Sequence, residues 1–133
     1  MKTSEEREQA FILLFEKSFN PETTADELYD TAVGEEIIES TKYTKDLFYD
    51  TVNHIAEIDD IIIEYSKERH FDRISKVSLS VLRLAVCEIM FFDKVPVGVS
   101  INEAVNLCKK YGSEDEYAFV NGILGSIARD EQK

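Results

Sequence analysis

Residues 76–92, KVSLSVLRLAVCEIMFF, form the segment that decides the fold. Apolar residues fall on every side of this predicted helix, and such a helix is normally the buried centre of a bundle. Two charged residues, Arg83 and Glu88, interrupt the apolar pattern. Because a buried charge is tolerated only when it is paired or hydrogen-bonded, we expect both to tie the helix to its neighbours. The alternative is that they face a partner protein.

A second helix is predicted after the turn at Pro96. Ser100 and Glu103 have the spacing of a capping box at its start. Gly112 stands where a helix commonly ends. A single apolar stripe at helical spacing runs between them: Ile101, Ala104, Val105, Cys108 and Tyr111.

The last helix is predicted to begin at Ser113, with Glu116 completing a capping box. Its inner face is expected to consist of Val120, Ile123, Leu124 and Ile127. Gly122 lies within this helix, where glycine costs about 1 kcal/mol relative to alanine. We therefore expect close packing or a close backbone approach at Gly122.

Helical signals also dominate the first half of the chain. Capping-box spacings occur at Thr3 with Glu6 and at Thr24 with Glu27. Residues 43–68 read as one long helix or as two shorter ones with a break near position 56. The predicted fold is all-α, a compact bundle of about seven helices that forms a single domain over residues 1–133.

The net charge of −12 is unevenly distributed along the 133 residues. Residues 1–50 carry 13 acidic and 5 basic side chains, whereas residues 51–133 carry 14 and 10. An acidic protein repels nucleic acid overall. Between residues 67 and 83, however, five basic side chains outnumber two acidic ones. This basic strip is either a solvated helix end or a surface for phosphate groups.

Residues suited to catalysis or metal binding are sparse. His54 and His70 lack metal-ligand spacing to each other or to a cysteine, and the chain has no glycine-rich phosphate loop. Cys87 and Cys108 lie in apolar runs and are expected to be buried thiols. We expect no enzyme activity, no metal and no cofactor. Without a ~20-residue apolar span or a signal peptide, a cytoplasmic protein without membrane contact is predicted.

The second half of the chain resembles the NusB family of transcription antitermination factors. The family pattern runs from an Arg-Leu-Ala-x-x-Glu helix through a proline turn to INEAV, KKYG and FVNG. Here these pieces correspond to Arg83–Glu88, Pro96, and residues 101–105, 109–112 and 119–122, in the same order and spacing. A weaker match covers the first helix, at Arg7, Glu8, Ala10 and Leu14.

The resemblance implies two packed helical sub-bundles and a bacterial factor that binds boxA RNA of ribosomal RNA transcripts. It implies that the protein acts with the ribosomal protein NusE in the RNA polymerase antitermination complex, without a cofactor. The expected RNA-binding residues are Lys2, Arg7, Arg69, Lys109, Lys110, Tyr117 and Phe119. The expected NusE-binding residues are Phe15, Arg73 and Ser78.

Several of these residues have an alternative structural interpretation. Lys109 and Lys110 either face phosphate or complement the dipole at the end of their helix. Tyr117 and Phe119 are candidates for stacking on unpaired bases, although one of the two could belong to the core.

Three departures from the family pattern bear on binding. The N-terminus reads MKTSEERE instead of an arginine-rich run, Phe15 replaces a tyrosine, and Ser78-Leu79 replaces an acidic and a basic residue. One alternative function is therefore an adaptor that keeps the NusE surface but has little RNA affinity of its own. Another alternative is that the chain is the helical domain that precedes a ribosomal RNA methyltransferase domain. That interpretation would require a longer chain.

Overall fold

The computed structural model describes residues 2–67 and 69–131. Within these residues the chain forms seven α-helices and one short 3-10 helix, and no strand. The helices are α1 (Lys2–Phe19), α2 (Ala25–Gly34), α3 (Lys42–Asn53), α4 (Ile55–Tyr65), η1 (Phe71–Arg73), α5 (Lys76–Phe91), α6 (Val97–Tyr111) and α7 (Glu114–Glu131). The prediction of an all-α bundle of about seven helices is confirmed.

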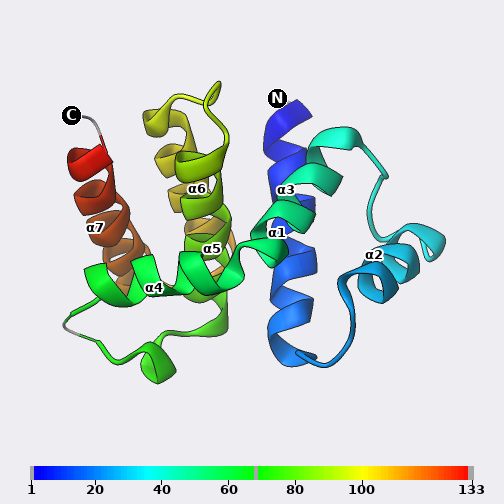
Figure 1. Cartoon of the computed structure of the whole chain (residues 1–133), viewed down its shortest axis with the longest axis horizontal. Coiled ribbons are helices and arrows are strands. Elements are labelled where there is room, and N and C mark those ends of the chain that lie inside the picture. Colours follow the sequence, from blue (N-terminus) through cyan, green and yellow to red (C-terminus); the bar gives the residue numbers. More distant parts are fainter. Residues whose placement is uncertain (1, 68, 132–133) are drawn as a thin grey trace.

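The helices form two packed groups (Figure 1). Helices α1, α2 and α3 lie on one side of the molecule, and α4 to α7 lie on the other. Helix α5 contacts both groups, because it packs against α1 and α3 as well as against α4, α6 and α7. The two sub-bundles therefore share α5 as their common centre.

Helix α5 is buried as its apolar pattern predicts. Leu82, Leu84 and Cys87 are at most 1% exposed. The two charged residues are tied to neighbouring helices: Glu88 is fully buried beside Arg7, and Arg83 donates two 2.8 Å hydrogen bonds to Asp59 of α4. Both ties predicted for α5 are confirmed.

Two predicted helix boundaries are confirmed. Thr24 forms the capping box of α2 with Glu27, in which each side chain accepts from the other residue's backbone N–H. The segment of residues 43–68 is broken at His54, between α3 and α4, two residues from the expected break. Both signals are local, since capping and helix interruption depend on residues a few positions apart.

Two predicted capping boxes are wrong. Helix α1 already includes Lys2, so Thr3 lies inside it. Helix α6 begins at Val97, directly after Pro96, and Ser100 lies in its first turns. Proline suits the start of a helix, because its φ angle is fixed and the N–H it lacks would have no partner within the helix there. The helix therefore begins four residues earlier than the Ser100 pattern predicts. The Ser100 hydroxyl instead donates to Glu88, at 2.7 Å.

The inner face of α7 is confirmed, but the expected packing at Gly122 is wrong. Val120, Ile123, Leu124 and Ile127 are all buried. Gly122 is exposed, and a Cβ atom placed on it would meet no other atom within 4 Å. Packing within the described residues therefore does not account for a glycine at this position.

Candidate nucleic-acid interface

The C-terminal end of α6 and the first half of α7 present cations beside aromatic rings. Lys109 is exposed in the last turn of α6, and its Nζ lies 5.0 Å from the centre of the Tyr117 ring. Tyr117 is half-buried on α7, which begins where the Ser113 hydroxyl accepts from the Glu116 N–H. A cation over an aromatic face is held in place without being neutralised, so Lys109 keeps its charge available.

A groove of about 400 Å³ continues from this pair along the seam between α6 and α7. Asn102 and Asn121 line it together with Lys109 and Tyr117. Side-chain amides both donate and accept hydrogen bonds, as recognition of unpaired base edges requires. The two asparagines were not among the predicted site residues. The exposed polar face of α6 was the signal that could have identified Asn102.

Phe119 lies on the other side of α7 from Tyr117, because two residues in a helix are about 200° apart around the axis. The Arg69 guanidinium lies 3.9 Å from the centre of the Phe119 ring. Both side chains are half-buried. The two predicted stacking residues therefore face different grooves, and each has its own basic side chain.

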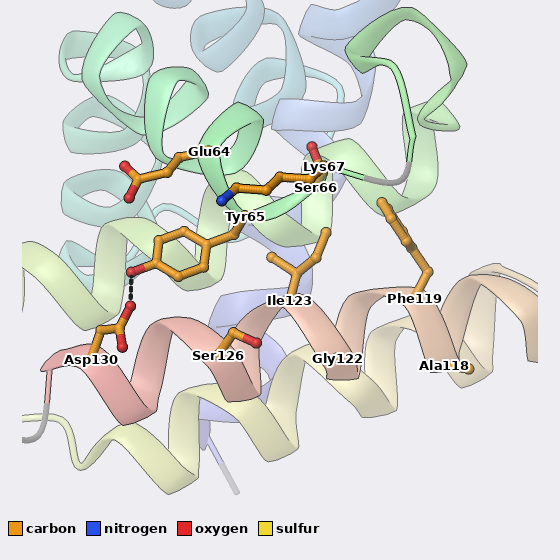
Figure 2. A pocket seen from close by; sticks show the side chains of 10 residues that line it. All are labelled: Glu64, Tyr65, Ser66, Lys67, Ala118, Phe119, Gly122, Ile123, Ser126 and Asp130. Carbon is orange, nitrogen blue, oxygen red and sulfur yellow. Dashed lines mark hydrogen bonds between the residues drawn. The ribbon is translucent and has the colours of Figure 1, made fainter.

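A larger groove, of about 600 Å³, separates the C-terminal end of α4 from α7 (Figure 2). Phe119 and Tyr65 stand toward its opposite ends, with Ile123 and Gly122 between them. Glu64 and Asp130 lie at the Tyr65 end, where the Tyr65 hydroxyl donates to Asp130. This hydrogen bond contributes to raising the pKa of Tyr65 to about 12, so the phenol stays protonated at neutral pH.

Lys110 is exposed next to Lys109 but is already paired. Its Nζ lies 2.6 Å from Glu8 Oε2 of α1, which also accepts from the Tyr111 hydroxyl. The hydrogen bonds from Lys110 and Tyr111 lower the pKa of Glu8, so the carboxylate is charged at neutral pH. Lys109 and Lys110 are adjacent in sequence, yet among the described residues Lys110 forms a salt bridge and Lys109 forms none.

Arg7 lies in the core instead of on an RNA-binding surface. It is 4% exposed, its Nε donates to Glu88 at 2.6 Å, and Nη2 lies 3.3 Å from the Tyr43 hydroxyl. Burial by itself would lower the pKa of Arg7, but the Glu88 carboxylate outweighs it and the pKa is raised. Lys2 begins α1, and its side chain lies outside the part that the structure describes.

The residues expected to bind NusE occupy three environments. Ser78 is fully buried, and its hydroxyl donates to Glu116 of α7 at 3.1 Å, so it has no surface to offer a partner. Arg73 is exposed in η1. Phe15 is half-buried and meets Phe19 edge to face, with ring centres 4.9 Å apart.

Phe19, which the sequence prediction did not include, packs against Phe15 at the C-terminal end of α1. It is 54% exposed, and Lys76 Nζ lies 5.3 Å from the centre of its ring. The four-residue spacing from Phe15 to Phe19 was a usable signal, since such residues share one face of a helix. A groove of about 410 Å³ next to this pair is lined by Lys17, Lys76, Leu79 and Arg83, among others.

Among the described residues, no three His, Cys, Asp or Glu side chains are grouped so that they could hold a metal ion. Both cysteines are buried thiols, and burial raises the pKa of each to about 12. Within the same residues, no helix has the length and apolar character needed to cross a membrane.

Comparison with protein families gives one match along most of the chain. The model of the NusB family matches residues 4–129. A transcription antitermination protein NusB from Natranaerobius thermophilus is 37% identical over 131 residues, covering 96% of this chain and 94% of that protein. The protein of the same name from Agathobacter rectalis is 39% identical, covering 96% of this chain and all of the relative.

Solved structures give the same result. A crystal structure of antitermination factors NusB and NusE in complex with dsRNA matches with a TM-score of 0.86 at 32% identity, covering 96% of each chain. The solution structure of NusB from Aquifex aeolicus matches with a TM-score of 0.81 at 32% identity, covering all of this chain and 94% of the other.

Proposed function

The chain belongs to the NusB family, and on that premise we propose that it is a transcription antitermination factor. It binds boxA-type RNA of ribosomal RNA transcripts together with the ribosomal protein NusE, and the complex helps RNA polymerase resist termination. The resemblance inferred from the sequence motifs is confirmed by the family match. The protein acts by binding in the bacterial cytoplasm, as a single domain over residues 1–133, and not by catalysis.

The observation that carries this proposal is the pair of cation–aromatic contacts on the two sides of α7. Arg69 with Phe119 and Lys109 with Tyr117 each combine a positive charge with a partly exposed ring. Proteins that bind single-stranded RNA use this combination, because the cation attracts the backbone and the ring stacks on a base. We assign RNA binding to these four residues, with Lys110 in a secondary role.

We assign NusE binding to the surface around Phe15, Phe19, Arg73 and Lys76. The Phe15–Phe19 pair provides an exposed aromatic anchor, and aromatic residues are enriched at protein interfaces. Arg73 and Lys76 add exposed charges at the edge of this surface. Ser78 is omitted from this assignment, and Arg7 is omitted from the RNA-binding residues, because both are buried.

The test is fluorescence anisotropy with a labelled boxA-type RNA and a scrambled strand of the same composition, with and without NusE. Binding by the protein alone should be weak and steeply dependent on salt, because its net charge is −12. NusE should raise the affinity for boxA-type RNA more than for the scrambled strand. Equal affinity for both strands in every condition would exclude sequence recognition.

A second candidate function is an adaptor that binds NusE but contributes little RNA affinity. It is favoured by the acidic first fifty residues and by the pairing of Lys110 with Glu8. Lys109→Glu separates the two candidates. In the RNA-binding factor this change lowers the RNA affinity of the NusE complex, whereas in the adaptor it leaves that affinity unchanged.

A further inference from the structure

The start of α5 lies between the surface assigned to NusE and the surface assigned to RNA. On the NusE side, Ser75 is the N-cap of α5 and stands in the chain between Arg73 and Lys76. On the RNA side, the first turn of α7 carries Glu116, directly before Tyr117. Ser75 and Glu116 are therefore each within two residues of a binding residue, on different surfaces.

One carboxylate joins these two positions. Oε2 of Glu116 accepts a hydrogen bond from the Ser75 hydroxyl and another, at 3.1 Å, from the Ser78 hydroxyl in the first turn of α5. The Ser75 hydroxyl in turn accepts from the Ser78 N–H, at 3.1 Å. A carboxylate is favourably placed beside the first turn of a helix, because the helix dipole is positive there. Glu116 therefore ties α7 to the start of α5.

The turn between α6 and α7 is packed against the same end of α5. Gly112 forms this turn, and a Cβ atom on it would lie 3.4 Å from Val77 Cγ1 of α5 and 3.3 Å from Glu116 Oε1. Such close approach leaves little room for any side chain at this position. Lys109 precedes the turn and Tyr117 follows it. The cation–aromatic pair of the RNA-binding surface therefore flanks a turn that is seated on α5.

We propose that Glu116 is a positioning residue through which NusE binding raises the affinity for RNA. This inference rests on the proposed function and names the residue that connects its two surfaces. NusE, bound at Arg73 and Lys76, fixes the start of α5, and the hydrogen bonds of Glu116 pass this constraint to the first turn of α7. RNA then meets Lys109 and Tyr117 already in place, so its binding costs less conformational entropy of the protein.

Ser78→Ala tests this tie without altering either surface, because Ser78 is fully buried. Fluorescence anisotropy gives the affinity for boxA-type RNA with and without saturating NusE, and the ratio of the two affinities is the enhancement by NusE. Ser78→Ala should lower the enhancement about threefold, within the range of a single hydrogen bond. The affinity for RNA without NusE, and for NusE without RNA, should stay close to native.

Ser80→Ala is the matched control. Ser80 lies two residues further along α5 and is also fully buried, but its hydroxyl has no hydrogen-bond partner among the described residues. The same atom is removed from the same helix in both variants, and only Ser78→Ala removes a bond to Glu116. Thermal unfolding checks that both variants are folded. Ser80→Ala should leave the enhancement by NusE unchanged.

Two variants of Glu116 separate its hydrogen bonds from its charge. Glu116→Ala removes both and should lower the enhancement about tenfold, within the usual range of coupling between two sites. Glutamine keeps a side-chain oxygen that can accept from both serines, so Glu116→Gln should retain most of the enhancement. A changed net charge acts on the RNA affinity with and without NusE alike, and it therefore cancels in the ratio.

Three results would overturn the coupling role. The first is native enhancement in both Ser78→Ala and Glu116→Ala. The second is an equal loss of RNA affinity with and without NusE, which would limit Glu116 to local support of α7. The third is a similar loss of enhancement in Ser80→Ala or in Glu116→Gln, which would assign the effect to packing or to charge. Failure of the proposed function looks different, because NusE would then raise the affinity of the native protein for boxA-type RNA no more than for scrambled RNA.

Discussion

Two regions of the molecule use the same chemistry for different purposes. In the buried junction, Arg7 meets Glu88 and the ring of Tyr43, 5.5 Å from its guanidinium carbon. On the exposed face of α7, Arg69 meets Phe119. Each region pairs an arginine with an aromatic ring. Their burial differs, since Arg7 is 4% exposed while Arg69 and Phe119 are each half-buried.

The difference shows that burial decides what such a pair can do. In the junction, Glu88 accepts from Arg7, Tyr43 and Ser100, which belong to α1, α3 and α6. A charge removed from water must have its hydrogen bonds satisfied inside the protein, so these groups hold the sub-bundles together. On α7, the Arg69–Phe119 pair remains partly in water, and its cation and ring can still meet a ligand.

The largest effect is expected from Glu88→Ala in the junction. Removal of the carboxylate leaves Arg7 charged and buried, and breaking a buried pair in this way costs about 3–5 kcal/mol. Chemical denaturation should show a reduced free energy of unfolding. Glu103→Ala is the control, since Glu103 lies 3.7 Å from Arg7 and is 19% exposed. If the Glu88→Ala variant were as stable as the native protein but bound its partner more weakly, Glu88 would be a binding residue and not a structural tie.

Leu84→Ala tests whether the shared helix α5 is the centre of both regions. Leu84 is 1% exposed, and its truncation should cost about 2–5 kcal/mol through lost burial and the cavity left behind. Leu79→Ala, at a half-buried position of the same helix, should cost less. A loss below about 1 kcal/mol at Leu84 would place α5 at the periphery and contradict its central role.

On the exposed face, Phe119→Ala should change binding more than stability. Loss of a stacking ring should reduce the preference for boxA-type RNA by about 1–3 kcal/mol. The fold should be preserved because Phe119 is only half-buried. Anisotropy with matched and scrambled RNA measures the first quantity and thermal unfolding the second. Unfolding without a change in RNA preference would make Phe119 a core residue, like those of the junction.

The two adjacent lysines should differ in the same assay. Lys109→Glu should lower the RNA affinity of the NusE complex and reduce the salt slope by about 0.7 for one lost phosphate contact. Lys110→Glu should have a smaller effect, since Glu8 already offsets its charge. The double variant should keep its fold, because both side chains are exposed. An equal effect of the two single changes would mean that Glu8 does not compete with RNA.

The smallest expected effect is a gain of RNA affinity in Glu8→Gln. Because the pKa of Glu8 is lowered, its carboxylate is charged and paired with Lys110 at every pH above the ordinary pKa of a carboxyl group. The pairing is lost as the pH falls through the lowered pKa of Glu8. At neutral pH the substitution should release Lys110 and raise affinity by at most about 1 kcal/mol, the range of surface ion pairs. Titration at several salt concentrations would detect it. Reduced affinity would assign Glu8 a direct RNA contact.

Local features were predictable from the sequence for a physical reason. The capping box of α2, the break near His54 and the buried face of α7 each depend on residues within a few positions of one another. The burial of α5 also follows from its own composition, because an all-round apolar helix is stable only inside the protein. The family motifs added the RNA-binding assignment, which composition and periodicity did not supply.

Site residues were harder to predict, because exposure depends on distant neighbours. Arg7 matches a family position near an RNA-binding end, yet its partner Glu88 lies 81 residues away. Ser78 is covered by Glu116, 38 residues later in the chain. Neither contact leaves a pattern in the surrounding sequence, and both residues therefore looked available for binding.

The sequence by itself determined the helical class, the central helix and the family, because these depend on local spacing and composition. The tertiary structure alone decided which charges are neutralised and which remain at the surface. Lys109 and Lys110 are equivalent in sequence, but Glu8 comes to Lys110 from 102 residues away. Helix formation is governed by near neighbours, whereas charge pairing and surface shape are governed by packing between helices.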